Sequence, residues 1–233
     1  MDKLTEDQKK RMIEAGQAVM NMSHGIKNIL QTLRSGQNIM DEALDRRDID
    51  MAKRTWGILR QNLDRIQKLS LDMLKFSKDE TPHLKPCRFN RLVESVVQSI
   101  HPQADQRQVG IRVQLDENLE QVSIDAEQMS DVVMNLLINA IEAVEPKTGR
   151  VIVHTELDSG AEQVVLRVSD NGPGIEDTGA IFEPFYSTKN NVGAGLGLTI
   201  AKKIIENHAG TIDVQSLPDE GSIFTVRIPI KPG

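Results

Sequence analysis

The sequence predicts a helical hairpin followed by an α/β sandwich, a fold of class α plus α/β. From residue 6 to residue 77 the chain contains no proline and repeats apolar residues at alternating spacings of three and four, which is typical of long packed helices. The remainder alternates amphipathic helical segments with strand-like runs. Helices combined with mostly antiparallel strands favour a sheet that carries its helices on one face.

The helical part is expected to be an antiparallel hairpin. A first helix should run from Glu6 to about Leu44, and the charged stretch from Asp45, DRRDID, indicates a turn before a second helix that ends near Ser77. Because two helices cannot enclose a core, we expect a homodimer that forms a four-helix bundle. The predicted seam of the first helix is Met12, Ala15, Val19, Met22, Ile26, Ile29, Leu33, Gly36 and Met40, and the second stripe is Trp56, Leu59, Leu63, Ile66 and Met73.

The segment DETPHLKPCRFN, from Asp79, is the predicted domain boundary, because its two prolines end the second helix. The expected domains are therefore residues 1–80, a linker at 81–89, and residues 90–233. In the last domain we expect helices near 91–106, 125–144 and 198–210. Strands are expected near 111–116, 150–157 and 163–170, followed by a closing hairpin over 211–217 and 222–230.

Composition excludes several functional classes. Residues 1–80 carry 15 Lys and Arg against 13 Asp and Glu, and the remainder carries 13 against 21, so no basic footprint for nucleic acid is present. The single cysteine, Cys87, excludes an internal disulfide. No apolar run approaches membrane-spanning length and no signal sequence opens the chain. We expect a cytoplasmic protein or the cytoplasmic portion of a larger sensor.

Four short clusters carry the functional signal: NLLINAIEA from Asn135, SDNGPGI from Ser169, FEPFYSTK from Phe182 and GAGLGL from Gly193. Asn135 and Asn139 stand one helical turn apart and face the same way. Asp170 ends a strand-like run before a tight glycine turn, where a carboxylate is placed to accept a hydrogen bond from the exocyclic amine of adenine.

The glycines of the last cluster precede a helical pattern, so free amides and the positive end of a helix dipole are expected to face a polyphosphate. Neither common phosphate motif fits. No GK[ST] ending is present, and Leu198 stands where the dinucleotide fingerprint requires its last glycine.

Taken together and in this order, the clusters resemble the N, G1, F and G2 boxes of the ATP-binding domain shared by histidine kinases, gyrase-type ATPases, Hsp90 and mismatch-repair ATPases. This resemblance to the GHKL type of domain runs from about Asn90 to the C-terminus. It implies ATP as cofactor, with Asn139 as the Mg2+ ligand and Asp170 as the adenine contact. The other nucleotide-binding residues that it implies are Asn135, Gly172, Gly174, Phe182, Phe185, Lys189, Gly193, Gly195, Gly197 and Leu198, of which Lys189 would reach the terminal phosphate.

The segment SHGIKNIL, from Ser23, resembles the H box of histidine kinases, most closely the HEIKNPL variety. The resemblance implies that His24 accepts the γ-phosphoryl group of MgATP and passes it to an aspartate of a response regulator. Asn28, one turn on, is where the family often places a group that orients water, which permits phosphatase activity. Gly25 replaces the acidic residue of the family and Ile29 its proline.

Two other classes remain open from the sequence. One is a chaperone-like ATPase of the same superfamily that gates its dimer with ATP, although the large extra domains of gyrase or Hsp90 are missing. The other is an ATP-binding regulatory module whose histidine no longer reacts, and Gly25 is the main argument for it. The input signal, the cognate regulator, cis or trans transfer and the identity of the general base are not readable from the sequence.

Overall fold

The computed structural model describes residues 6–78, 81–119, 121–184, 186 and 195–230, and within these it leaves the side chains of residues 6–19, 21, 22 and 24 undescribed. The chain divides into two compact units. The first comprises residues 1–78 and 183–196, and the second comprises residues 79–182 and 197–233. Among the described residues, no helix combines the length and apolar character needed to cross a bilayer.

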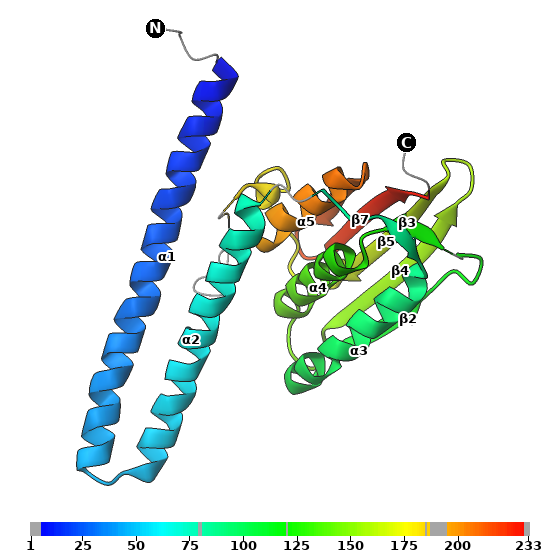
Figure 1. Cartoon of the computed structure of the whole chain (residues 1–233). Coiled ribbons are helices and arrows are strands. Elements are labelled where there is room, and N and C mark those ends of the chain that lie inside the picture. Colours follow the sequence, from blue (N-terminus) through cyan, green and yellow to red (C-terminus); the bar gives the residue numbers. More distant parts are fainter. Residues whose placement is uncertain (1–5, 79–80, 120, 185, 187–194, 231–233) are drawn as a thin grey trace, which may run out of the picture. The chain divides into compact units, whose positions relative to one another are not determined.

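The first unit is built on the predicted helical hairpin. Helix α1 spans Glu6–Asp45 and α2 spans Ile49–Ser77, and the two run side by side in opposite directions (Figure 1). The chain reverses at Arg47, whose φ of 56° is left-handed, and the carboxylate of Asp48 accepts a hydrogen bond from the Met51 amide at 2.9 Å. This N-cap starts α2 where the sequence places its charged turn.

The inner face of α2 is more polar than the sequence analysis expects. Thr55, Asn62 and Leu69 are buried at intervals of seven, and the Asn62 amide donates to the Ile58 carbonyl at 2.8 Å. Leu59 lies so close to Gly36 that a β-carbon at Gly36 would be 2.8 Å from its Cδ2 atom. A larger residue at Gly36 would force the end of the Leu59 side chain to shift, so glycine favours this close approach of the two helices.

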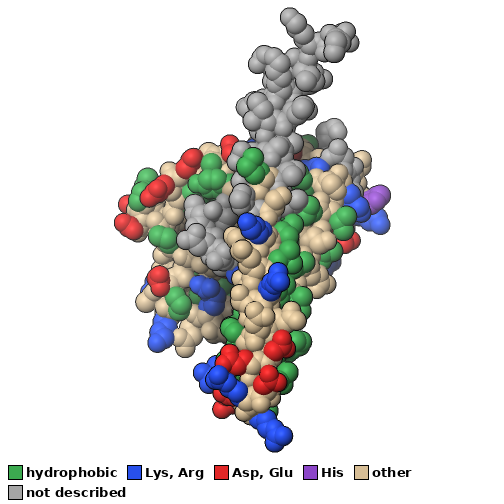
Figure 2. Space-filling view, turned by 90° about the vertical axis from the view of Figure 1, so that its left-hand side faces the viewer, with side chains coloured by type: hydrophobic (Ala, Val, Ile, Leu, Met, Phe, Trp, Pro, Cys, Tyr) green, Lys and Arg blue, Asp and Glu red, His purple; other side chains and the backbone are tan. Residues whose placement is uncertain are grey.

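Two residues of the predicted apolar stripe lie outside this inner seam. In the single chain, Trp56 is 55% exposed and Leu63 is 51% exposed, because they occupy the positions next to Thr55 and Asn62 on the helix. Figure 2 shows apolar side chains exposed along the hairpin. Helix α2 thus carries apolar side chains on a face that the hairpin does not cover.

The second unit contains a five-stranded sheet in the order β2-β4-β5-β7-β6, in which only the β2 and β4 pair is parallel. Helices α3, α4 and α5 cover one face of this sheet (Figure 1), as predicted. The bounds of its elements are α3 Phe89–Arg107, β2 Gly110–Gln114, α4 Ala126–Ala143, β4 Arg150–Asp158, β5 Gln163–Asp170, α5 Gly197–Asn207, β6 Thr211–Leu217 and β7 Gly221–Pro229.

Helix α4 lies at the centre of the core. Its Leu136, Leu137 and Ile141 side chains are completely buried, as is Leu166 of β5. Strand β4 lies where a strand was predicted, and its side chains alternate in burial, because Val151 and Val153 are buried whereas Ile152 and His154 are only partly so. The register of β4 and β5 pairs Val153 with Val168. These apolar contacts hold α4 in a fixed position above the sheet.

Three short elements were not expected from the sequence. Strand β1, Lys85–Cys87, pairs antiparallel with β3, Val122–Ile124, and a 3-10 turn, η1, spans Ala180–Phe182. The segment predicted as a linker therefore contributes a strand. Directly before β1, the His83 amide donates to Asp125 Oδ2 at 3.0 Å. This hydrogen bond and the strand pair fasten the linker beside the start of α4.

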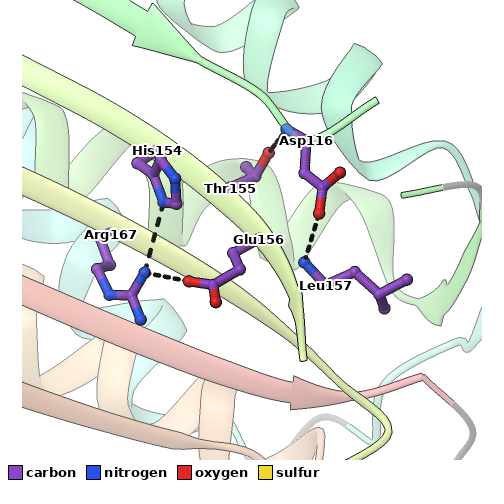
Figure 3. A network of polar contacts seen from close by, with 6 residues as sticks. All are labelled: Asp116, His154, Thr155, Glu156, Leu157 and Arg167. Carbon is purple, nitrogen blue, oxygen red and sulfur yellow. Dashed lines mark hydrogen bonds and ion pairs between the residues drawn. The ribbon is translucent and has the colours of Figure 1, made fainter. Parts of the chain in front are cut away.

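The loop after β2 is fastened to β4 by a carboxylate (Figure 3). Asp116 Oδ2 accepts from the Leu157 amide at 3.0 Å, and the Asp116 amide donates to the hydroxyl of Thr155 at 3.2 Å. The backbone amide of Leu157, followed by that of Asn118, holds the pKa of Asp116 below its usual value. Nearby, Arg167 of β5 forms an ion pair with Glu156 of β4.

Candidate functional site

Helix α4 presents the two asparagines of the first cluster. It begins at the N-cap Asp125, whose Oδ1 atom accepts hydrogen bonds from the amides of Glu127 at 3.1 Å and Gln128 at 3.2 Å. Asn135 and Asn139 are half-buried at the edge of the apolar face. Their spacing of one turn leaves two amide groups on the same side of the helix.

The second cluster forms a tight turn at the end of β5. The Asp170 side chain is 9% exposed, and its Oδ1 atom accepts a hydrogen bond from the Gly172 amide at 2.9 Å. A β-carbon at Gly172 would lie 2.9 Å from that oxygen and 3.0 Å from the carbonyl oxygen of Ala143 at the end of α4. Gly172 is therefore needed for the turn to lie against the helix.

The hairpin between β6 and β7 supports this turn from the other side. Gly174 has a φ of 78°, and a β-carbon there would overlap the Leu217 carbonyl oxygen. The hydroxyl of Ser216 accepts from the Ile175 amide at 2.8 Å and donates to the Gly221 carbonyl at 2.8 Å. The backbone around Asp170 is thus held by named contacts on two sides.

Helix α5 brings the last glycine of the fourth cluster to α4. A β-carbon at Gly197 would lie 3.3 Å from Asn135 Oδ1, so the backbone of α5 begins beside the Asn135 amide. Leu198 follows in the first turn of α5. The structure therefore brings Asn135 together with Gly197, and it places Asp170 and Gly172 at the C-terminal end of the same helix α4.

The 3-10 turn that ends at Phe182, the first residue of the FEPFYSTK cluster, contacts α5. The hydroxyl of Thr199 donates to the Phe182 carbonyl at 3.1 Å, and Lys202 Nζ lies 5.6 Å from the centre of the Phe182 ring. This distance is within the range of a cation–π interaction. The position of Phe182 is thereby fixed by two residues of α5 that the sequence analysis did not select.

The remaining predicted residues are described only in part. Phe185, Lys189 and Gly193 lie outside the described residues, whereas Gly195 is described and has a left-handed backbone with a φ of 67°. The backbone of His24 lies in α1, and its side chain is outside the description. Asn28 is exposed on α1.

The arrangement in the second unit fits a nucleotide. A carboxylate beside a glycine turn is suited to an exocyclic amine, and amide oxygens are donors that Mg2+ accepts. Close approaches of the backbone leave no room for a side chain at Gly172 and Gly174 and little room at Gly197. No cluster of three or more His, Cys, Asp or Glu side chains that could hold a metal is found in the part of the chain that the structure describes.

Comparison with known proteins agrees with these features. Residues 124–232 match the family described as histidine kinase-, DNA gyrase B-, and HSP90-like ATPase, which supports ATP as the nucleotide. A solved catalytic domain of histidine kinase ThkA is 30% identical, with a TM-score of 0.58 over 64% of this chain and 99% of that chain. The chain belongs to the histidine kinase family.

This histidine kinase chain matches relatives over its helical hairpin as well as over the second unit, which we call the nucleotide unit. The signal transduction histidine-protein kinase AtoS of Escherichia coli (strain K12) is 30% identical over 97% of this chain but only 36% of its own length. The crystal structure of histidine kinase ThkA in complex with response regulator protein TrrA is 25% identical, with a TM-score of 0.80 over 99% of this chain and 69% of that one. The predicted order of helical hairpin and α/β sandwich is confirmed.

The sequence analysis did not identify three residues that lie next to the Asp170 turn or hold the Phe182 turn of this histidine kinase. Ser216, Ser222 and Thr199 are common residue types in strands and helices, and no local motif distinguishes them. Ser222 is buried and stands directly opposite Asp170 in the register of β5 and β7. Only the strand register, which depends on contacts distant in sequence, reveals this neighbour.

Proposed function

We propose that the chain is the catalytic portion of an ATP-dependent histidine kinase that phosphorylates His24 and then passes the phosphoryl group to an aspartate of a response regulator. The observation that carries the proposal is the meeting of Asn135, Gly197 and the Asp170 turn on one helix, α4, downstream of a hairpin that carries the H box.

On the nucleotide side, Asp170 would bind the adenine amine, and Gly172 and Gly174 would form the wall beside it. Asn139 would supply an oxygen ligand to Mg2+, with Asn135 one turn away. Gly193, Gly195, Gly197 and Leu198 would line the polyphosphate, Lys189 would reach its terminal phosphate, and Phe182 with Phe185 would pack the segment that covers it.

On the acceptor side, a neutral imidazole nitrogen of His24 attacks the γ-phosphorus. A nitrogen–phosphorus bond forms, the bond between the γ-phosphorus and the bridging oxygen breaks, and ADP leaves with that oxygen. The proton of the other imidazole nitrogen must be held or accepted by a base. Catalysis of this kind depends mainly on positioning and charge neutralisation.

The proposed partners are a second copy of the chain and a response regulator. The exposed apolar face of the hairpin, which includes Trp56 and Leu63, supports a homodimer with a four-helix bundle. The ThkA structure was solved with a response regulator, which supports a regulator as the acceptor here. Exposed Asn28 would orient water for phosphatase activity on that regulator. Because the proposed reaction consumes ATP, the proposed site of action is the cytoplasm.

The test is to incubate the protein with terminally labelled MgATP and to treat the labelled protein with acid and with base. Label that is lost in acid and kept in base is expected, because phosphohistidine is acid-labile. The His24→Gln variant should bind ATP without acquiring stable label. Stable label on His24→Gln would overturn the assignment of His24. ATP hydrolysis without any protein-bound label would instead favour the chaperone-like ATPase, and ATP binding with neither would favour a regulatory module.

A further inference from the structure

A buried histidine outside the proposed catalytic residues links the two helices of the nucleotide site. His208 follows the last residue of α5 and is 5% exposed. Its Nδ1 atom lies 2.7 Å from the carbonyl oxygen of Ile204, and its Nε2 atom lies 3.1 Å from the amide nitrogen of Asp125. The ring therefore contacts its own helix with one nitrogen and the N-cap of α4 with the other.

These two partners fix the protonation of the ring. A carbonyl oxygen only accepts a hydrogen bond, so Nδ1 must carry a proton and donate it. A backbone amide only donates, so Nε2 must be unprotonated and accept from Asp125. His208 is thus held as the neutral tautomer protonated on Nδ1, and an apolar replacement would leave the Asp125 amide without this acceptor.

The link lies at one end of the packed pair of helices α4 and α5, and a second contact between them lies in the proposed nucleotide site. The N-cap of α4 meets the C-terminal end of α5 at His208, and the first residue of α5, Gly197, meets α4 at Asn135. The helices therefore run in opposite directions, and these two contacts lie about 15 Å apart along α4. Two fixed points prevent one helix from sliding along the other.

We propose that His208 is a positioning residue: by accepting the Asp125 amide it holds α4 and α5 in the register that places Asn135 beside Gly197 for nucleotide binding. The inference rests on the proposed nucleotide site. His208 contacts no reacting atom and acts through Asp125. The carboxylate of Asp125, which also receives the His83 amide, attaches the linker at the same point.

Three variants separate the two hydrogen bonds of the ring. His208→Gln keeps an acceptor at the distance of Nε2, His208→Asn keeps only a donor near Ile204, and His208→Leu keeps neither. His101→Leu, which removes an exposed histidine of α3, is the control. The dissociation constant for MgATP and the Michaelis constant for autophosphorylation are measured on the full chain, and thermal unfolding confirms that each variant folds.

His208→Leu and His208→Asn should weaken MgATP binding on the order of tenfold, the equivalent of one hydrogen bond, while His208→Gln stays within about twofold of the wild type. The Michaelis constant for ATP should rise and the labelling rate at saturating ATP should stay the same, because the acceptor histidine is untouched. Equal affinity in all folded variants would show that His208 only fills the core.

The imidazole nitrogen resonances of the wild-type protein provide a second test that needs no variant. Nuclear magnetic resonance should find His208 protonated on Nδ1 and bare on Nε2. A ring protonated on Nε2 would overturn the inference even if the apolar variant fails to fold. If the wild type binds no MgATP, the proposed nucleotide site fails, and that result is distinct from equal affinities among variants that do bind.

Discussion

The backbone of Gly197 begins α5 against the side chain of Asn135, with only 3.3 Å between Asn135 Oδ1 and the position that a β-carbon would take. Glycine is thus favoured here by the neighbouring amide of Asn135 and not by its own backbone angles. Through this approach the G2 box meets the N box.

Gly197→Ala should weaken nucleotide binding without unfolding the protein. The added methyl group forces Asn135 to move by a few tenths of an ångström, whereas alanine itself favours a helix. We expect the dissociation constant for MgATP to rise roughly threefold to tenfold. Isothermal titration against Gly160→Ala, where a β-carbon would make only an ordinary contact of 3.5 Å with Asp158, provides the comparison. Equal affinities would show that Asn135 moves at no cost.

Gly174→Ala should destabilise the nucleotide unit. Its φ of 78° is left-handed and its β-carbon would overlap the Leu217 carbonyl oxygen, so both backbone strain and a clash oppose the change. A loss of about 1–3 kcal/mol in the free energy of unfolding is expected. Urea unfolding measures it, again with Gly160→Ala as reference. A loss no larger than that of the reference would contradict the close contact between the Asp170 turn and the β6 to β7 hairpin.

Gly25→Glu should accelerate autophosphorylation at saturating ATP. A carboxylate beside His24 can accept the proton that the imidazole must lose, and general-base catalysis contributes roughly 10²–10⁴-fold. A β-carbon at Gly25 would meet nothing within 4 Å, so a side chain can start there without a clash. Gly25→Ala is the matched control, because it adds about 1 kcal/mol of helix stability without a carboxylate. An equal or slower rate for Gly25→Glu would show that another group orients His24.

Stability should fall in acid through Asp116. Its pKa is lowered chiefly by the Leu157 amide, so the folded state favours the ionised carboxylate. The stabilisation by the ionised Asp116 carboxylate is therefore complete above its unfolded pKa of about 3.9 and is lost as pH falls through the lower folded pKa. Asp116→Asn should lose less stability than the wild type between pH 6 and pH 3 in urea titrations. Glu117→Gln, which removes the neighbouring carboxylate, is the control.

Trp56→Glu should shift the protein from dimer to monomer. Trp56 is 55% exposed in the single chain, beside a seam that the hairpin already closes. A charge there would have to be buried in a four-helix bundle, which is costly without a partner. Light scattering at micromolar concentration measures the mass, with Glu94→Gln in α3 as a surface control. A monomeric wild type would refute the predicted bundle.

The elements that the sequence predicted well are those with a strong period. Helix α1, strand β4 and the charged turn between the two long helices rest on local signals, and each element appears where it was expected. The side chains of the first half of the predicted α1 seam lie outside the description. Strands β1 and β3 have three residues each and no period to detect. The inner seam of α2 was harder to predict, because a helix with apolar residues on more than one face does not reveal which face packs on its partner. The seam also contains the polar residues Thr55 and Asn62, which are buried although their type favours the surface.

The residues of the candidate site likewise divide into those with a local sequence signal and those without one. Asp170, Asn135 and the glycines stand in motifs that are readable along the chain, whereas Ser216 and His208 act through partners 41 and 83 residues away. A hydroxyl or an imidazole at such a position has no local signature. Sequence therefore indicates the residues proposed to meet the nucleotide, and the fold is needed to find those that hold them.

The hydrogen bond from His83 to Asp125 also determines how freely the nucleotide unit is tethered. The C-cap of α2 is Lys78, so only residues 79–82 separate the end of the hairpin from the first fixed point of the linker. Five extended steps reach at most about 18 Å. A linker this short gives the nucleotide unit a high effective concentration relative to the hairpin of the same chain, in the millimolar range typical of short linkers.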